Sequence, residues 1–157
     1  MTEQTALAVR KTVTVKAPAE RAFSVFTEGI SRWWPLATNH IGATVPVEAV
    51  VEPREGGRWF ERAADGSECE WGRVLAWEPP RRLLLAWELN ADWKHDPAVA
   101  TEVEVLFEPA PDGGTTVTLE HRGLEAFGER APQMRDVFAS PGGWSGMLDT
   151  YATVAAA

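Results

Sequence analysis

The sequence predicts an α+β fold in which a curved antiparallel sheet of about six or seven strands packs over a long C-terminal helix. Between Thr44 and Arg122, apolar residues alternate with polar ones at period two, and turn residues interrupt the pattern at short intervals. After Gly143, apolar residues recur instead at three- and four-residue spacing, as on one face of a helix. A sheet with one apolar face has to cover that face, and the final helix is the available cover.

The chain opens with a predicted strand followed by one or two short helices. Residues 9–16 alternate near their end, as in a half-buried strand. Pro18 suits the first position of a helix because its fixed φ angle is already helical. The residues after it form an apolar stripe at helical spacing, made of Ala19, Ala22, Phe23, Phe26 and Ile30. Pro35 ends the segment that carries Trp33 and Trp34.

The period-two region predicts six more strands. They are Val45–Glu52, Arg58–Arg62, Glu68–Trp77, Leu83–Leu89, Thr101–Pro109 and Thr115–Arg122. Short turns such as Ala64-Asp65-Gly66-Ser67 join successive strands, and short connections of this kind produce an antiparallel meander. Residues 90–100 include polar residues and Pro97, which predicts a loop.

The C-terminal region predicts two helices separated by a break. Segment 124–139 is expected to hold the shorter helix, and Pro141-Gly142-Gly143 then interrupts the chain. The final helix is expected over 143–155, with an apolar face made of Trp144, Met147, Leu148, Tyr151 and Ala155. A length of 157 residues suits one core, so we expect a single domain over residues 9–155 behind a flexible N-terminus of residues 1–8.

Charge and composition argue against several classes of function. The formal net charge of −8 repels phosphate backbones and anionic lipids, so neither nucleic acid nor a membrane is an expected partner. No apolar run is long enough to span a bilayer, and residues 1–9 lack the pattern of a secretory signal. Cys69 is the one cysteine, which fits a reducing compartment. Together these features predict a cytoplasmic protein.

Tryptophan is strongly over-represented, with eight residues in the chain. The indole ring is bulky and carries an N–H group that needs a hydrogen-bond partner when it is buried. A small core rarely needs so many such rings. We therefore expect the tryptophans either to line a cavity or to form an exposed patch.

Five blocks of sequence occur in a characteristic order. They are Val13–Phe23, Trp33-Trp34-Pro35, Glu52–Trp59, Gly72–Trp87, and Leu119–Leu124 with Gly143-Trp144. This combination resembles the START/Bet v 1-like superfamily, also called the SRPBCC or helix-grip fold. Within it, the chain is similar to the activator of Hsp90 ATPase homologue 1-like (C-terminal domain) family. The superfamily includes lipid and hormone binders, cyclases, hydrolases and co-chaperone domains, so the resemblance implies a fold without deciding the function.

The resemblance implies that the space between the sheet and the final helix is commonly open. Strand and helix periodicity direct one set of side chains toward this space, namely Leu85, Trp87, Val105, Phe107, Trp144, Leu148 and Tyr151. We expect Trp33 and Trp34 near the entrance, and His40 in a loop at the mouth. The alternative is a core that is completely filled, with no cavity.

Two ionisable residues are further candidates for the cavity wall. His121 shares a strand face with Val117 and Leu119, so it approaches the cavity if that face points inward, where a neutral imidazole could orient a ligand or move a proton. A histidine at the core edge, bonded to backbone, is the simpler alternative and the one we favour. Glu61 shares a face with Trp59, but the pattern leaves open whether that face points inward. A solvated Glu61 is the default interpretation.

No known catalytic motif is present, and the three histidines lack the short spacing of metal ligands. We therefore predict a binding domain for a small apolar molecule, with no cofactor and no metal site. One alternative is an enzyme of cyclase, dehydratase or hydrolase type that moves a proton with His121 and Glu61 in the same cavity. A second is an Hsp90-type co-chaperone or stress-related module, which only the resemblance implies. A homodimer through an edge strand or a tryptophan patch is also open.

Overall fold

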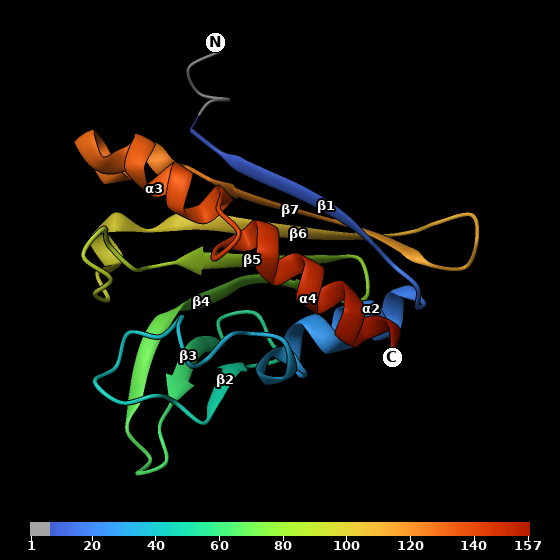
Figure 1. Cartoon of the computed structure of the whole chain (residues 1–157), viewed down its shortest axis with the longest axis horizontal. Helices are drawn as coiled ribbons and strands as arrows, with labels where there is room; N and C mark the ends of the chain where they lie inside the picture. Colours follow the sequence, from blue (N-terminus) through green and yellow to red (C-terminus); the bar gives the residue numbers. More distant parts are fainter. Residues whose placement is uncertain (1–6) are drawn as a thin grey trace.

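The computed structural model describes residues 7–157 and is built around one seven-stranded antiparallel sheet (Figure 1). The strands are β1 (Val9–Val15), β2 (Glu48–Val51), β3 (Arg58–Arg62), β4 (Glu68–Glu78), β5 (Arg82–Trp87), β6 (Thr101–Pro109) and β7 (Thr115–Arg122). Their order in the sheet is β1-β7-β6-β5-β4-β3-β2. Strands β2 to β7 are therefore neighbours in sequence order and form a meander, and β1 pairs with β7 at its edge. Residues 1–6, most of the predicted flexible N-terminus of residues 1–8, lie outside the described part of the chain.

The helices lie on one face of this sheet (Figure 1). After β1 come α2 (Ala19–Thr27) and the 3-10 helix η1 (Ile30–Arg32), and η2 (Pro97–Val99) precedes β6. After β7 come η3 (Leu124–Arg130), α3 (Ala131–Ala139) and α4 (Trp144–Ala156). The end of α4 meets α2, where the Arg21 Nε donates to the Ala155 carbonyl at 2.7 Å. The predicted α+β helix-grip fold is confirmed, including the break between the two C-terminal helices.

Two register shifts change which side chains of β3 and β4 face the core. One lies between Trp59 and Phe60, and the other lies between Val74 and Ala76. At a bulge an extra residue disturbs the alternation, and both Trp59 and Phe60 are buried. The strand predicted at Val45–Glu52 is shorter in the structure, because only Glu48–Val51 pairs with β3.

The outer face of the sheet is charged and the inner face is apolar. On the outer face the Glu104 carboxylate pairs with two arginines, at 2.6 Å from the Arg82 Nε and 2.7 Å from the Arg122 Nη1. Leu85 and Leu119 on the inner face are fully buried. The inner face therefore holds the core, and α4 covers it as the sequence predicts.

The core is tightly filled where α2 and α4 meet the sheet. The ring centroids of Phe23 and Phe107 are 5.1 Å apart, and those of Phe26 and Tyr151 are 5.2 Å apart. The Tyr151 hydroxyl is fully buried and donates to the Ala22 carbonyl at 2.6 Å. We call this region the filled end. Within residues 7–157, no helix is long and apolar enough to cross a membrane.

Candidate ligand-binding pocket

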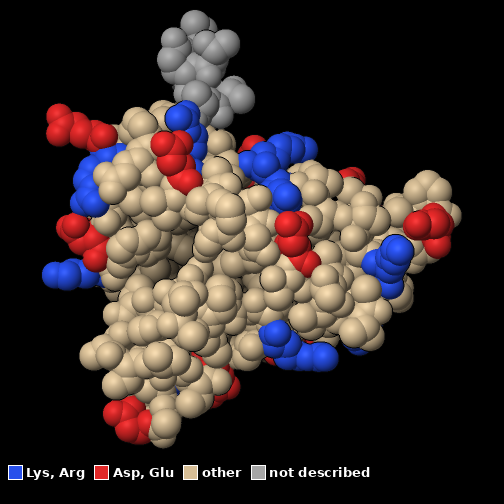
Figure 2. Space-filling model, in the orientation of Figure 1, with Lys and Arg blue, Asp and Glu red and all other residues tan. Residues whose placement is uncertain are grey.

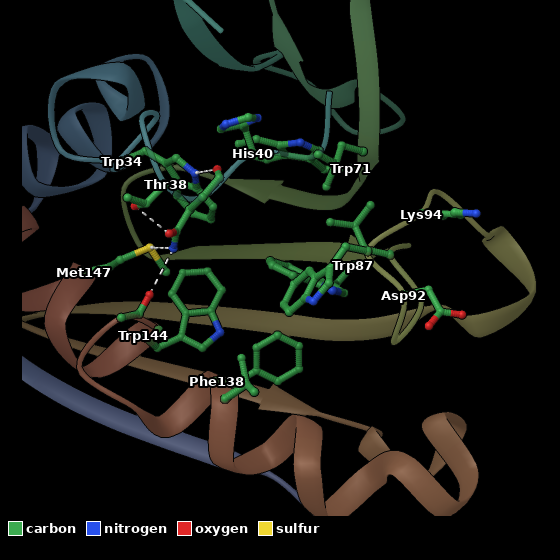
Figure 3. A pocket seen from close by; sticks show the side chains of 17 residues that line it. Trp34, Thr38, His40, Trp71, Trp87, Asp92, Lys94, Phe138, Trp144 and Met147 are labelled. Carbon is green, nitrogen blue, oxygen red and sulfur yellow. Dashed lines mark hydrogen bonds between the residues drawn. The ribbon is translucent and has the colours of Figure 1, made fainter. Parts of the chain in front are cut away.

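A pocket of about 470 Å³ opens at the other end of the layer between sheet and helices (Figure 3). Its walls come from β4, the end of β5, the loops at 38–42 and 89–94, and the junction of α3 with α4. The lining residues are Trp34, Thr38, Asn39, His40, Ile41, Trp71, Trp87, Leu89, Asp92, Trp93, Lys94, Val137, Phe138, Gly142, Gly143, Trp144 and Met147. Figure 2 shows a hollow on this face of the molecule, bordered mainly by uncharged side chains. We call this region the open end.

Aromatic rings are prominent in the pocket wall. Six of the lining side chains are tryptophan or phenylalanine: Trp34, Trp71, Trp87, Trp93, Phe138 and Trp144. Trp34 and Trp71 are nearly stacked, with centroids 4.8 Å apart and ring planes 33° apart. Trp87 and Phe138 meet edge to face at 5.3 Å. In Figure 3 the labelled rings of Trp34, Trp71, Trp87, Phe138 and Trp144 lie around the pocket, while Asp92 and Lys94 lie on the loop at its outer edge.

Glycines allow α3 and α4 to meet closely enough to form one wall. A Cβ atom added at Gly146 would overlap the Pro141 carbonyl, and one added at Gly143 would overlap the Val137 carbonyl. Because these positions lack side chains, α4 begins directly against the end of α3. Trp144, the first residue of α4, is thereby directed inward and is buried.

Loop 38–42 forms the opposite wall and is held to the helix junction by Asn39. The Trp34 Nε1 donates to the Asn39 carbonyl at 2.8 Å, and the Asn39 Nδ2 donates to the Gly142 carbonyl at 3.0 Å. Figure 3 shows both contacts bridging the wall. The loop therefore has a defined position although it contains no helix or strand.

Glu61 holds the same loop from behind. Its buried carboxylate accepts hydrogen bonds from the Ile41 N–H at 2.7 Å, the Gly42 N–H at 3.1 Å and the Trp71 Nε1 at 2.8 Å. The face of β3 that carries Trp59 and Glu61 thus points inward, which the sequence left open, and a solvated Glu61 is wrong. Glu61 does not border the pocket. Its three hydrogen bonds instead hold loop 38–42 and Trp71, which do border it, in position.

His121 is buried behind the pocket with both ring nitrogens engaged. The Trp144 Nε1 donates to His121 Nδ1 at 3.1 Å, which leaves the proton on Nε2 to be donated to the Thr101 hydroxyl at 2.8 Å. Burial lowers the pKa of His121 to about 3, so the ring is neutral at ordinary pH. The simpler alternative, a core histidine, fits this geometry, although its partners are side chains and not backbone.

The structure brings four of the thirteen predicted lining residues together at the pocket: Trp34, His40, Trp87 and Trp144. The other nine do not border it: Trp33, Trp59, Glu61, Leu85, Val105, Phe107, His121, Leu148 and Tyr151. These nine are buried behind the wall or at the filled end, where neighbouring side chains occupy the space.

Three aromatic residues on the wall were not predicted. Trp71 faces the pocket from β4 and is the residue that the pairing skips at the register shift between Trp59 and Phe60, so simple alternation could not place it. Trp93 lies in a loop with no periodicity and adopts an unusual positive φ of 61°. Phe138 lies at the end of α3, and the helical spacing of Ala131, Met134 and Phe138 was the signal that could have identified its inward face.

His40 is the histidine that borders the pocket. Its Nδ1 lies 3.1 Å from the Gly42 carbonyl, and a carbonyl can only accept, so Nδ1 carries the proton of a neutral ring. The Nε2 lone pair is then left to accept a hydrogen bond or a proton. Within residues 7–157, no cluster of three or more histidine, cysteine or acidic side chains could hold a metal ion.

The sequence profile described as "Activator of Hsp90 ATPase homolog 1-like protein" matches residues 16–154. The chain belongs to this family. Solved structures extend the likeness over nearly the whole chain. An anthrahydroquino-gamma-pyrone synthase, Txn09, complexed with SUM, is 38% identical, with 94% of this chain and 96% of that chain covered and a TM-score of 0.65. A comparison with curated proteins found no match.

Two further solved structures are similar to this chain to different degrees. The self-sacrificing resistance protein CalC from Micromonospora echinospora is 30% identical, with 94% and 93% of the two chains covered and a TM-score of 0.66. The Aha1 dimer from Colwellia psychrerythraea is 14% identical, with 95% and 96% covered and a TM-score of 0.62, and shares the fold alone. Two solved structures that are at least 30% identical to this chain are thus named as a synthase and as a resistance protein.

Proposed function

We propose that the chain binds a planar aromatic small molecule in the pocket at its open end. The observation that carries this proposal is the wall of six aromatic side chains around about 470 Å³ of space. Ligand sites are typically concave, largely apolar and of this size, with a few polar groups that fix orientation. Flat aromatic ligands gain most from such walls, because ring faces and edges pack against them favourably.

One of the named relatives supports the same proposal. The 38% identical relative is called a synthase of an anthrahydroquino-gamma-pyrone, which is a fused aromatic ring system. That relative aligns over 94% of this chain, which supports an aromatic ligand for this pocket. The acidic and basic residues of the wall, Asp92 and Lys94, lie at its outer edge, away from the labelled aromatic rings (Figure 3).

Blocking the mouth of the pocket tests this function. Val137 borders the pocket and is 38% exposed, so Val137→Trp should fill the mouth without disturbing the core. Val45 is 54% exposed and does not border the pocket, so Val45→Trp is the matched control. In isothermal titrations with a panel of bicyclic to tetracyclic aromatic compounds, we expect Val137→Trp to weaken binding about tenfold or more and Val45→Trp to leave it unchanged. Equal affinities in the two variants would contradict the proposal.

A second candidate function is catalysis of proton transfer in the same pocket. It is favoured by the Nε2 of His40, which has no hydrogen-bond partner among residues 7–157, together with the synthase among the relatives. In this candidate function the proton acceptor is His40 and not His121, because both ring nitrogens of His121 are engaged with Trp144 and Thr101. A phenolic O–H of a bound ring would lose its proton to Nε2 and retain the electron pair on oxygen.

Turnover of phenolic aromatic compounds, followed by mass spectrometry, tests this second function. We expect His40→Gln to retain binding and lose at least tenfold in rate, in line with the usual contribution of a general base. His95→Gln is the control, because His95 does not border the pocket. An unchanged rate in His40→Gln would remove His40 from the mechanism.

The homodimer, the chaperone partner and the cytoplasmic location stay predictions. The Aha1 dimer is too distant in sequence to carry its assembly over to this chain. Light scattering over a concentration series tests the dimer, and recovery of a complex with an Hsp90-type chaperone tests the partner.

A further inference from the structure

The buried tryptophans of the pocket differ in how their indole N–H groups are bonded. Three donate to protein acceptors: Trp34 to the Asn39 carbonyl, Trp71 to the Glu61 carboxylate and Trp144 to His121 Nδ1. The fourth, Trp87, has no hydrogen-bond partner for its Nε1 among residues 7–157. Its side chain is nevertheless buried, with only 5% of the residue exposed.

An unpaired buried donor is unusual and calls for an explanation. Most buried polar groups in folded proteins have a partner, because leaving one without any loses the hydrogen bonds that water would have made. The neighbours of Trp87 are mainly other rings, including Trp59 at 5.6 Å, Phe138 at 5.3 Å and Trp144 at 6.0 Å between centroids. Trp87 borders the pocket with other atoms of its ring, so a ligand supplies the missing acceptor only if it moves aside one of the rings that enclose the Nε1.

We propose that the Trp87 N–H orients the ligand, and that the ligand is a planar polycyclic aromatic compound with a ring carbonyl oxygen, as in a quinone. This inference rests on the proposed binding function and specifies the ligand for the same pocket. A ring carbonyl accepts in the plane of the ring system, so one molecule can both pack against the aromatic walls and receive the indole N–H. A hydroxyl in the same place would bring a proton of its own, for which the surrounding rings offer no good acceptor.

Trp59 provides a comparison inside the same molecule. Its Nε1 is also buried and without a partner, but Trp59 does not border the pocket. The two residues are in edge contact, so they share an environment and differ in access to a ligand. A ligand that bonds to Trp87 should therefore leave the Trp59 N–H unpaired.

The experiment compares two probes that differ only in ring carbonyls, anthraquinone-2-carboxylate and anthracene-2-carboxylate. Each is titrated into the full-length chain labelled with nitrogen-15, and the eight indole N–H signals are followed by NMR. We expect both probes to shift the signals of the pocket tryptophans. The quinone alone should move the Trp87 indole proton downfield, as hydrogen bonding does, and it should bind about five- to tenfold more tightly. The Trp59 signal should not move downfield.

Two variants assign the signals and test the preference independently. Trp87→Phe removes the N–H group and should abolish the preference for the quinone, whereas Trp59→Phe should retain it. If both probes bind equally and the Trp87 signal does not move downfield, the inference is wrong while the binding function stands. If neither probe shifts the pocket indole signals, the binding function fails and the inference falls with it. The wild-type titration decides between these outcomes even if a variant does not fold.

Discussion

The filled end and the open end of the layer between sheet and helices are both rich in aromatic residues, but only the open end contains a pocket. At the filled end, Phe23, Phe26, Phe107 and Tyr151 contact one another and occupy the space. At the open end, six tryptophan and phenylalanine side chains surround a pocket of about 470 Å³. Aromatic content therefore does not by itself create a cavity. The walls of the pocket are held in their positions by the hydrogen bonds of Asn39 and Glu61 and by the glycine junction of α4.

The two ends also differ in the hydrogen bonds of their buried tyrosine and tryptophan side chains. At the filled end the Tyr151 hydroxyl donates to the Ala22 carbonyl and the Trp33 Nε1 donates to the Val25 carbonyl. At the open end the Trp87 Nε1 has no partner within residues 7–157. We infer that substitutions at the filled end mainly change stability, while substitutions at the open end mainly change binding.

The largest expected effect is at the filled end. Phe107 is fully buried between Phe23 and Phe26, so Phe107→Ala should lower the free energy of unfolding by about 3–5 kcal/mol through lost burial and the cavity that remains. Urea unfolding at equilibrium measures the loss. A loss below about 1 kcal/mol would show that this end is not closely packed.

The next effect depends on pH and comes from His121, behind the pocket. The unfolded ring takes up a proton below pH 6.5, whereas burial lowers the pKa in the folded chain to about 3. Between these values the unfolded chain binds more protons, so stability is complete above pH 6.5 and falls as the pH decreases. His121→Gln should show a shallower fall across this range when thermal unfolding is measured from pH 7 to pH 4. Parallel curves for the two proteins would contradict a neutral, buried His121.

A smaller loss is expected from one hydroxyl at the filled end. Tyr151→Phe leaves the ring in place and removes the hydrogen bond to the Ala22 carbonyl, which should cost about 1 kcal/mol. Burial raises the pKa of Tyr151, so the difference should be the same at pH 7 and pH 9. Denaturant unfolding at both values measures it, with Thr153→Val on the exposed side of α4 as the control. A difference that disappears at pH 9 would argue against a protonated, buried hydroxyl.

The smallest effect on stability is expected at the mouth of the pocket. Trp93 is 40% exposed and has a φ of 61°, a conformation that glycine adopts without strain. Trp93→Gly should therefore change the free energy of unfolding by less than about 1 kcal/mol, because relieved strain offsets the lost contacts with Trp87 and Phe138. The same variant should weaken binding of an aromatic ligand in fluorescence titrations. A large loss of stability with unchanged affinity would contradict the inference that substitutions at the open end mainly change binding.

Much of the fold could be predicted because periodicity and turn residues act locally. The strands Arg58–Arg62, Thr101–Pro109 and Thr115–Arg122 have the bounds expected from alternation, and the final helix differs from its expected range by one residue at each end. The strand expected at Val45–Glu52 is shorter because its length depends on pairing with β3, which its own residues do not determine.

The pocket was harder to predict because it depends on long-range packing. The register shifts at Trp59 and Val74 set which side chains of β3 and β4 face inward, and bulges leave little trace in a single sequence. The expected direction of His121 is correct, yet it borders no open space, because Trp144 and Phe138 lie in front of it. Alternation gives the face of a strand, and only the packed structure shows which part of that face stays uncovered.

A crystal structure of the chain grown with anthraquinone-2-carboxylate tests the central claim most directly. The account predicts density for the probe between Trp34, Trp87 and Phe138, with a ring oxygen within about 3.2 Å of the Trp87 Nε1 and the filled end unchanged. Density for the probe outside the pocket, or pocket walls that close on one another and leave no space, would contradict it.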